Sequence, residues 1–422
     1  VTGVDAGDFA VTGSTASVTG VTGSGDSYAV TVSGGDLAGL TGEVGLGLDA
    51  GASIDDLAGN ALTDLDPTGA DETYSLDNTA PVVSAFERET PPGAATNADT
   101  LTWAVTFSES VTGVDAADFA VTGSTASVTG VTGSGASYSV TVSGGDLAGL
   151  SGEVGLDLDA AASINDLAGN ALTDLDPTGA DETYTLDNTL PTVSAIEREA
   201  PPGASTNADT LTWAVTFSEA VIGVDAADFA VNGSTAFVTG VSGSGASYAV
   251  TVSGGNLAGL SGEVGLDLDA AASINDLAGN ALTDLNPTGA DETYSLENDR
   301  PTVASIERSV PSTQITNADS LTWTVTFSES VTGVDAGDFA VAGSTASVTG
   351  VGGSGASYAV TVSGGDLAGL SGEVGLGLDA GASIADAVGN ALTDFDPTGA
   401  DETYTLENDR PTVASIERSV PS

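Results

Sequence analysis

Cysteine and histidine are absent from this 422-residue chain, and its basic residues number only six. Without cysteine the chain forms neither disulfides nor thiolate metal sites. Without either residue type, the common nucleophile–base pairs of covalent catalysis cannot be assembled. No apolar run approaches the ~18 residues that a membrane-spanning helix needs. We therefore expect a protein that is not an enzyme and does not insert into a membrane.

Positive charge is scarce: 60 acidic residues stand against six arginines, which gives a formal net charge of −54. We expect no nucleic-acid partner, because the neutralisation of phosphates requires cationic side chains. An excess of one sign also destabilises a compact state through self-repulsion. The composition therefore indicates a compensating agent: bound divalent cations, a high-salt environment that screens the charges, or both. The alternative is that the charge only makes an acidic, soluble surface.

Internal repetition is what the sequence has in abundance. Trp103, Trp213 and Trp323 lie 110 residues apart, and VDAGDF at residue 4 returns as VDAADF at 114 and 224 and as VDAGDF at 334. Self-similarity at a fixed period indicates an array of like modules. The repeat predicts an incomplete module over 1–80 that lacks its first two strands, complete modules over 81–190, 191–300 and 301–410, and the first strand of a further module over 411–422.

The two partial modules lead to an expectation about the whole chain. We interpret the sequence as a window on a longer array, since 411–422 repeats 301–312 (PTVASIERSVPS). The alternative is that 411–422 of one copy completes the open first module of the next copy, in a head-to-tail filament built by strand donation. The expected partners are thus neighbouring modules of the same chain and, in the alternative, other copies of the chain.

Apolar and small polar residues alternate within 81–190. Leu101, Trp103 and Val105 are separated by threonine and alanine, and the same period of two recurs at 138–142 and 154–158. This period is typical of strands with one buried face. The sequence GSGAS at 133–137 predicts a hairpin turn. About seven short strands per repeat, without helical periodicity, predict an all-β fold of tandem immunoglobulin-like β-sandwiches with a 110-residue repeat.

Short linkers that contain proline join the modules. They read DNTLP at Asp187–Pro191 and ENDRP at Glu297–Pro301 and Glu407–Pro411. Proline fixes φ and restricts the residue before it. We therefore expect stiff joints rather than flexible tethers.

Taken together, these patterns resemble the tandem bacterial immunoglobulin-like (Big-type) repeats of giant surface adhesins and extracellular fibres. The matching segments are TWAVTFSESVTGVDAADFAVTG (102–123), INDLAGNAL (164–172) and DETYTLDNTLP (181–191), and the resemblance covers essentially the whole chain. It implies modules that build long extracellular stalks or fibres at the cell surface, often stiffened by calcium.

The loops of each module offer ligands for calcium, which takes six to eight oxygens from carboxylates, carbonyls and amides. In an immunoglobulin-like fold, the loops after the second strand and before the last strand lie at the end that faces the preceding module. We therefore expect Ca²⁺ at the joints. The alternative is that Asp, Asn and Gly occupy these loops for turn chemistry alone. The predicted ligands are Glu109, Asp115, Asp118, Asp166, Asn170, Asp187, Asn188, Glu219, Asp225, Asp228, Asp276, Asn280, Glu297, Glu329, Asp335, Asp338, Asp386 and Asn390.

Among functions, the sequence favours a structural stalk or spacer of a long extracellular bacterial surface adhesin, stiffened by calcium at its joints. A self-assembling extracellular filament or sheath subunit is the alternative, in which contacts between copies are the function. A repeated glycan-binding module that acts through avidity is least favoured. It would need exposed aromatic rings, and the alternation places most of them inside the modules.

Overall fold

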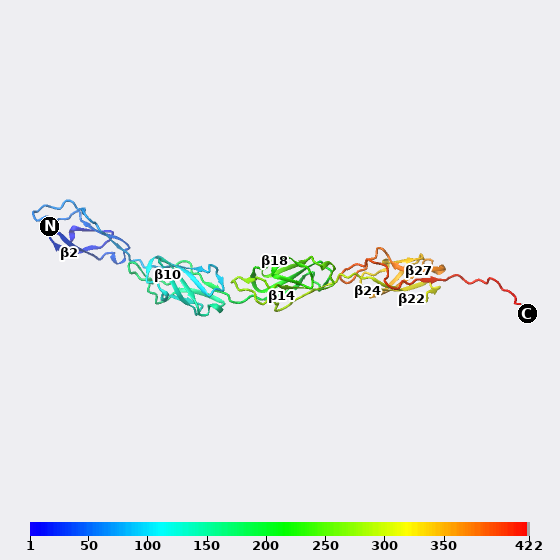
Figure 1. Cartoon of the computed structure of the whole chain (residues 1–422). Helices are drawn as coiled ribbons and strands as arrows, with labels where there is room; N and C mark the ends of the chain where they lie inside the picture. Colours follow the sequence, from blue (N-terminus) through cyan, green and yellow to red (C-terminus); the bar gives the residue numbers. More distant parts are fainter. Residues whose placement is uncertain (420–422) are drawn as a thin grey trace. The chain divides into compact units, whose positions relative to one another are not determined.

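Residues 1–419 are described by the computed structural model (Figure 1). Every regular element among them is a β-strand or a three-residue 3-10 helix. This part of the chain divides into two units. The first comprises Val1–Leu190 and Leu277–Asn280, and the second comprises Pro191–Asp276 and the described residues from Ala281 onward. No helix within 1–419 is long and apolar enough to cross a membrane.

The module over 81–190, in the first unit, is a sandwich of two sheets. In one sheet β8 pairs antiparallel with β6, β10 and β12. The other sheet has the order β7-β13-β11-β9, and β7 is parallel to β13. The strands are β6 (Val83–Thr90), β7 (Ala95–Thr96), β8 (Thr100–Thr112), β9 (Phe119–Thr122), β10 (Ser127–Ser143), β11 (Gly152–Leu158), β12 (Asn165–Asp166) and β13 (Tyr184–Leu186).

Alternate residues of β8 form the centre of the core between the sheets. Leu101, Trp103 and Val105 are fully buried, as the period of two predicted. The Trp103 ring packs edge-on against Tyr184, with ring centroids 4.8 Å apart, an arrangement that the quadrupoles of aromatic rings favour. The predicted immunoglobulin-like sandwich is confirmed.

Strand β10 folds back on itself at the Gly/Ser-rich segment. The side-chain oxygens of Thr129 and Ser143 lie 3.0 Å apart across the two arms. In residues 1–80 the equivalent arms are two separate strands, β2 (Ser17–Ser24) and β3 (Ser27–Ser33), which pair antiparallel. The hairpin predicted at 133–137 is therefore present.

Two sandwiches of the same design make up the second unit, and their Trp–Tyr pairs also have centroids 4.8 Å apart. The first contains β14 (Val193–Ala200), β15 (Ser205–Thr206), β16 (Thr210–Ile222), β17 (Phe229–Asn232), β18 (Phe237–Ser253), β19 (Gly262–Leu268), β20 (Asn275–Asp276) and β21 (Tyr294–Leu296). The second contains β22 (Val303–Val310), β23 (Ile315–Thr316), β24 (Ser320–Val331), β25 (Phe339–Ala342), β26 (Ser347–Ser363), β27 (Gly372–Leu378) and β28 (Tyr404–Leu406).

Residues 1–80 form a smaller arrangement without counterparts of β6 and β8 among the described residues. Besides β2 and β3 they contain β1 (Phe9–Thr12), β4 (Gly42–Leu48) and β5 (Tyr74–Leu76). As a result Tyr74 is 79% exposed, whereas its counterpart Tyr184 is fully buried. Residues 411–419 form no strand, and Ile416 is 91% exposed, although the same sequence forms β22 with Ile306 buried. Burial of this strand depends on the neighbours that β22 has and 411–419 lacks.

Candidate cation site at the module joint

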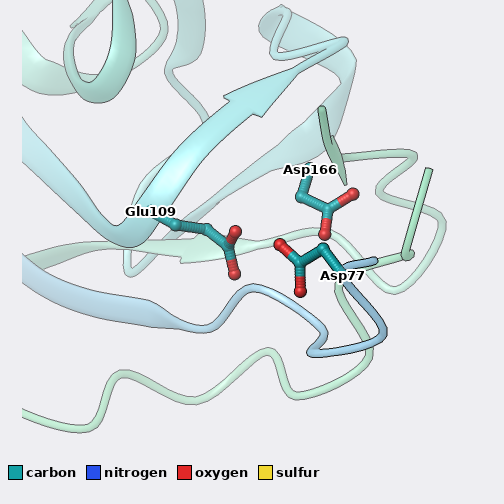
Figure 2. Close-up of side chains that lie close together, drawn as sticks. All are labelled: Asp77, Glu109 and Asp166. Carbon is teal, nitrogen blue, oxygen red and sulfur yellow. The ribbon is translucent and has the colours of Figure 1, made fainter. Parts of the chain in front are cut away.

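Three carboxylates converge where the linker after β5 meets the next module. Asp77 follows β5, Glu109 lies near the end of β8, and Asp166 ends β12 (Figure 2). One carboxylate oxygen of each lies within 4.8 Å of the others. Asp166 is buried, and the other two are partly buried. The first unit thus gathers a cluster of oxygens from the linker of one module and two strands of the next.

Pairing of β12 with β8 brings Asp166 near Glu109. Asp166 lies opposite Val111, two residues further along β8 than Glu109. The Asp166 carboxylate accepts hydrogen bonds from the main-chain N–H groups of Gly169 (2.6 Å) and Asn170 (2.8 Å). Gly169 has a φ of +97°, which residues with a side chain rarely adopt. The sequence D-x-x-G-N therefore forms a loop that holds its own aspartate.

The side-chain amide of Asn170 connects the two modules. Its Nδ2 donates to the main-chain oxygen of Asp77 at 2.9 Å and to the Asp166 carboxylate at 2.7 Å. An amide nitrogen is a donor and cannot serve as a ligand to a cation. This contact between linker and module therefore does not depend on a bound ion.

The charges within the cluster influence one another. Burial, together with the nearby carboxylates of Asp77 and Asp166, raises the pKa of Glu109 above its usual value. Burial also opposes ionisation of Asp166, but the hydrogen bonds from Asn170 and Gly169 outweigh it and lower the pKa of that carboxyl. Asp166 is therefore stabilised as an anion, whereas the ionisation of Glu109 is opposed.

The donor set suits a hard cation. Ligand oxygens lie about 2.3–2.6 Å from Ca²⁺, so two oxygens on one ion are at most about 5 Å apart. The oxygens of the cluster, all within 4.8 Å, satisfy this limit. Three carboxylates offer up to about six oxygens and no sulfur or imidazole, the donors that zinc and copper favour. The cluster can therefore hold a metal ion.

The second unit contains a corresponding joint, between the modules over 191–300 and 301–410. Asn390 donates from Nδ2 to the main-chain oxygen of Glu297 at 2.8 Å, and its Oδ1 accepts from the Nδ2 of Asn207 at 3.0 Å. The amide contact of the first unit is thus repeated here, with a second contact to the preceding module.

Acidic residues surround this second joint as well. Burial, followed by the carboxylates of Asp386, Glu297 and Asp299, raises the pKa of Glu329. Asp386 is buried and accepts hydrogen bonds from the main chain of the 389–390 turn, as Asp166 does. The linker differs from that of the first joint in having the longer glutamate, one additional aspartate and Arg300.

Another group of predicted ligands caps short helices. Asp115 accepts a hydrogen bond from Ala117 N, and Asp118 accepts from Asp115 N at 2.7 Å and from Ser163 N at 2.8 Å. Asp118 is only 2% exposed. The same capping boxes recur in the second unit at Asp225, Asp228, Asp335 and Asp338. These carboxylates satisfy main-chain donors, which is the turn chemistry that the alternative interpretation assigned to the loops.

The remaining predicted ligands lie at the end of the first unit and within the second. Asn188 donates to Leu147 O and Leu150 O of its own module. Asp187 accepts from the main chain at 189, and its main-chain oxygen receives the Asn280 amide at 2.7 Å. In the second unit, carboxylate oxygens of Glu219 and Asp276 lie within 4.8 Å of each other.

Asp77 belongs to the cluster but was not among the predicted ligands. Its signal was present in the sequence, because it precedes Asp187 by one 110-residue period in the same Asp-Asn-Thr tripeptide. Extending the 110-residue period from Asp187 towards the N-terminus leads to Asp77.

Comparisons with known proteins give structural neighbours but no sequence family. No protein-family model matches the chain, and no curated protein matches it. The chain is similar to the solved I9–I11 tandem from titin, with 10% identity, a TM-score of 0.25, and coverage of 78% of this chain and 96% of that one. It is also similar to the full Ig1–Ig3 ectodomain of mouse nectin-like molecule 4, with 11% identity, a TM-score of 0.23, and coverage of 75% and 98%. Likeness at this level of identity concerns the fold alone.

Proposed function

We propose that the chain is part of a structural stalk or spacer of a long extracellular bacterial surface adhesin, and that Ca²⁺ at the module joints stiffens it. The observation that carries this proposal is the cluster of Asp77, Glu109 and Asp166, which joins a linker to the following module. The same types of residue recur one and two periods later, at 187, 219 and 276 and at 297, 329 and 386. A joint that is repeated along a chain serves reach and stiffness rather than chemistry at one centre.

A cation changes the stiffness of such a joint for a physical reason. The Asn170 amide fixes the linker at one point, the main-chain oxygen of Asp77. Rotation about that point remains open, and the three carboxylates repel one another when all are ionised. A bound Ca²⁺ replaces this repulsion with coordination and connects the linker to both β8 and β12. The joint then has several points of attachment, which define its angle.

Distance measurements across one joint test the calcium part of the proposal. Because the chain has no cysteine, spin labels can be placed uniquely at Ser24→Cys and Ser134→Cys, two exposed positions on either side of the joint. Ca²⁺ should narrow the distribution of distances between the labels, and a chelator should broaden it. Glu109→Gln should weaken this response. Glu153→Gln, the same change at an exposed position of β11, should leave it intact.

Two outcomes would contradict the proposal at different points. A distance distribution that Ca²⁺ does not alter would remove the calcium part. Small-angle scattering tests the stalk itself, since an array of separate modules gives a long particle in both Ca²⁺ and chelator. A profile of a collapsed particle in both conditions would remove the stalk.

A further inference from the structure

The first and last segments of each complete module run parallel to each other. In the module over 81–190, β7 pairs in parallel with β13, and Phe86 of β6 forms a parallel bridge with Asp181. The same parallel contacts occur in both modules of the second unit. The chain therefore enters and leaves each module through neighbouring strands that point the same way.

Main-chain hydrogen bonds join the two segments along their length. Phe86 N donates to Ala180 O at 2.8 Å, and Glu182 N donates to Phe86 O at 2.9 Å. Further bonds of this ladder are Thr178 N to Val83 O, Thr185 N to Ala94 O and Asp187 N to Thr96 O, at 3.1, 2.7 and 3.0 Å. Every one of them has a counterpart in the two modules of the second unit. The contact extends from the start of β6 to the linker after β13.

The arginine of β6 lies within this ladder. Arg88 pairs with Glu182 through Nη2 at 3.1 Å, donates from Nη1 to Thr183 O at 2.9 Å, and donates its main-chain N–H to the Glu182 carboxylate at 2.8 Å. Arg198–Glu292 and Arg308–Glu402 repeat these contacts. Trp103 donates to Glu182 O at 2.8 Å and so connects the ladder to the core. These arginines account for three of only six basic residues in the chain.

Equilibrium stability alone is a weak explanation for this pair. Arg88 is 20% exposed and Glu182 is 37% exposed at the side chain, and half-buried ion pairs contribute little net free energy. The Nε of Arg88, Arg198 and Arg308 is moreover buried without a hydrogen-bond partner, which is unfavourable. The arrangement nevertheless recurs in every complete module, at the same place in the ladder.

The direction of tension supplies a better explanation. Tension on the array pulls β6 towards its N-terminus and the segment 178–187 towards its C-terminus. For parallel neighbours these pulls are opposite and lie along the strands, so they shear the ladder and load its hydrogen bonds together. Antiparallel neighbours pulled in this way would open one bond at a time. We propose that each ladder, locked by its Arg–Glu pair, is a shear clamp that allows the proposed stalk to bear tension.

Residues 1–80 provide a contrast within the same chain. Glu72 and Thr73 stand in the same PTGADETY sequence as Glu402 and Thr403, but no strand corresponding to β6 lies beside them among the described residues. This part of the 422-residue chain therefore forms no such ladder among the described residues. Under tension it should yield before any complete module.

Single-molecule pulling of the full chain, attached through cysteines added at both ends, tests the clamp. A complete module releases roughly 360–400 Å of chain when it unfolds, and residues 1–80 release roughly 260–290 Å, which identifies each event. Arg88→Gln, Arg198→Gln and Arg308→Gln combined should make the complete modules unfold on the order of tenfold faster at a given load. Lysine at the same positions should restore part of the loss, because it keeps the charge without the bidentate fork.

A matched variant separates a mechanical role from a general loss of stability. Ile164→Val, Ile274→Val and Ile384→Val remove one methylene from each buried site outside the clamp. When the two variants have the same midpoint of unfolding in denaturant, the complete modules of the arginine variant should unfold at a much lower force than those of the isoleucine variant. Equal losses in the two variants, or complete modules that yield at the same force as residues 1–80, would overturn the clamp. The stalk and its calcium joints are tested by scattering and label distances, so the two proposals fail independently.

Discussion

Removal of the Asn170 side chain should loosen the joint of the first unit even when no cation is present. Asn170→Ala deletes the hydrogen bond to the main-chain oxygen of Asp77 and the one to the Asp166 carboxylate. Asp166 keeps its bonds from the main-chain N–H groups of residues 169 and 170. The variant therefore removes the amide contact between linker and module while the cradle of Asp166 is retained.

The expected size follows from the one hydrogen bond that crosses the joint. A neutral hydrogen bond of ordinary length, such as that between Asn170 Nδ2 and Asp77 O, contributes about 0.5–1.5 kcal/mol. Since 1.4 kcal/mol corresponds to a factor of ten, the ratio of closed to open joints should fall about two- to tenfold. With Ca²⁺ bound the change should be smaller, because coordination of Asp77, Glu109 and Asp166 holds the same two parts together.

Labels at positions 24 and 134 measure this change in chelator and in Ca²⁺. Asn188→Ala is the matched control, because its amide donates only to Leu147 O and Leu150 O of its own module. If Asn170→Ala and the unsubstituted chain gave the same distribution of label distances in chelator, the amide contact would be refuted as a part of the joint. Calorimetric titration adds a second criterion. If the side-chain oxygen of Asn170 were a ligand, Asn170→Ala would clearly lower Ca²⁺ affinity, whereas we expect a small change.

Three further results are expected. Burial and then the Asp77 carboxylate of the linker raise the pKa of Glu109. Closure of the joint brings Asp77 to Glu109 and therefore takes up a proton. In chelator the joint should be most closed below the ordinary pKa of 4.5 and should open as pH rises through the raised pKa, as label distances will report. Leu156→Ala in the core of the module over 81–190 should lower its free energy of unfolding by ~2–5 kcal/mol and displace one transition in calorimetry. Gly123→Ala should lower the free energy of unfolding by more than about 2 kcal/mol in the same assay, because φ is +77° and the new Cβ would lie 2.0 Å from Glu153 O. Gly149→Ala should lower it far less, because no atom lies within 4 Å of the new Cβ there.

Strands long enough to show alternation were predictable, and very short ones were not. β8 and β11 carry the period of two over several residues, and their buried faces agree with it. β7 and β12 contain two residues each, and a period cannot be recognised in two residues. Yet β12 supplies Asp166 to the cluster and β7 belongs to the ladder. The shortest strands therefore carry much of the functional geometry.

The candidate site was predictable in its residue types but not in their assignment. Asp115 and Asp166 both stand in loops rich in Asp, Gly and Ala, and composition alone does not distinguish a helix cap from a ligand. A finer signal exists, because Asp-x-x-Asp before a strand fits a capping box, which assigns Asp115 and Asp118 to main-chain donors as observed. Asp166 also accepts main-chain N–H groups, and it lies near Glu109 and Asp77 only because of the pairing of β12 and the course of the linker.

Arg88 illustrates the limit of local reasoning most clearly. From the sequence, an arginine that follows glutamate in a first strand indicates a surface ion pair of little value. Its partner Glu182 is 94 residues away, and neither alternation nor turn signals reveal that the first and last segments are parallel neighbours. That order of strands decides whether tension shears the ladder or opens it bond by bond. The same Arg–Glu pair in an antiparallel ladder would bear load only when the opening reached it, so the proposed resistance to tension depends on topology first and on the ion pair second.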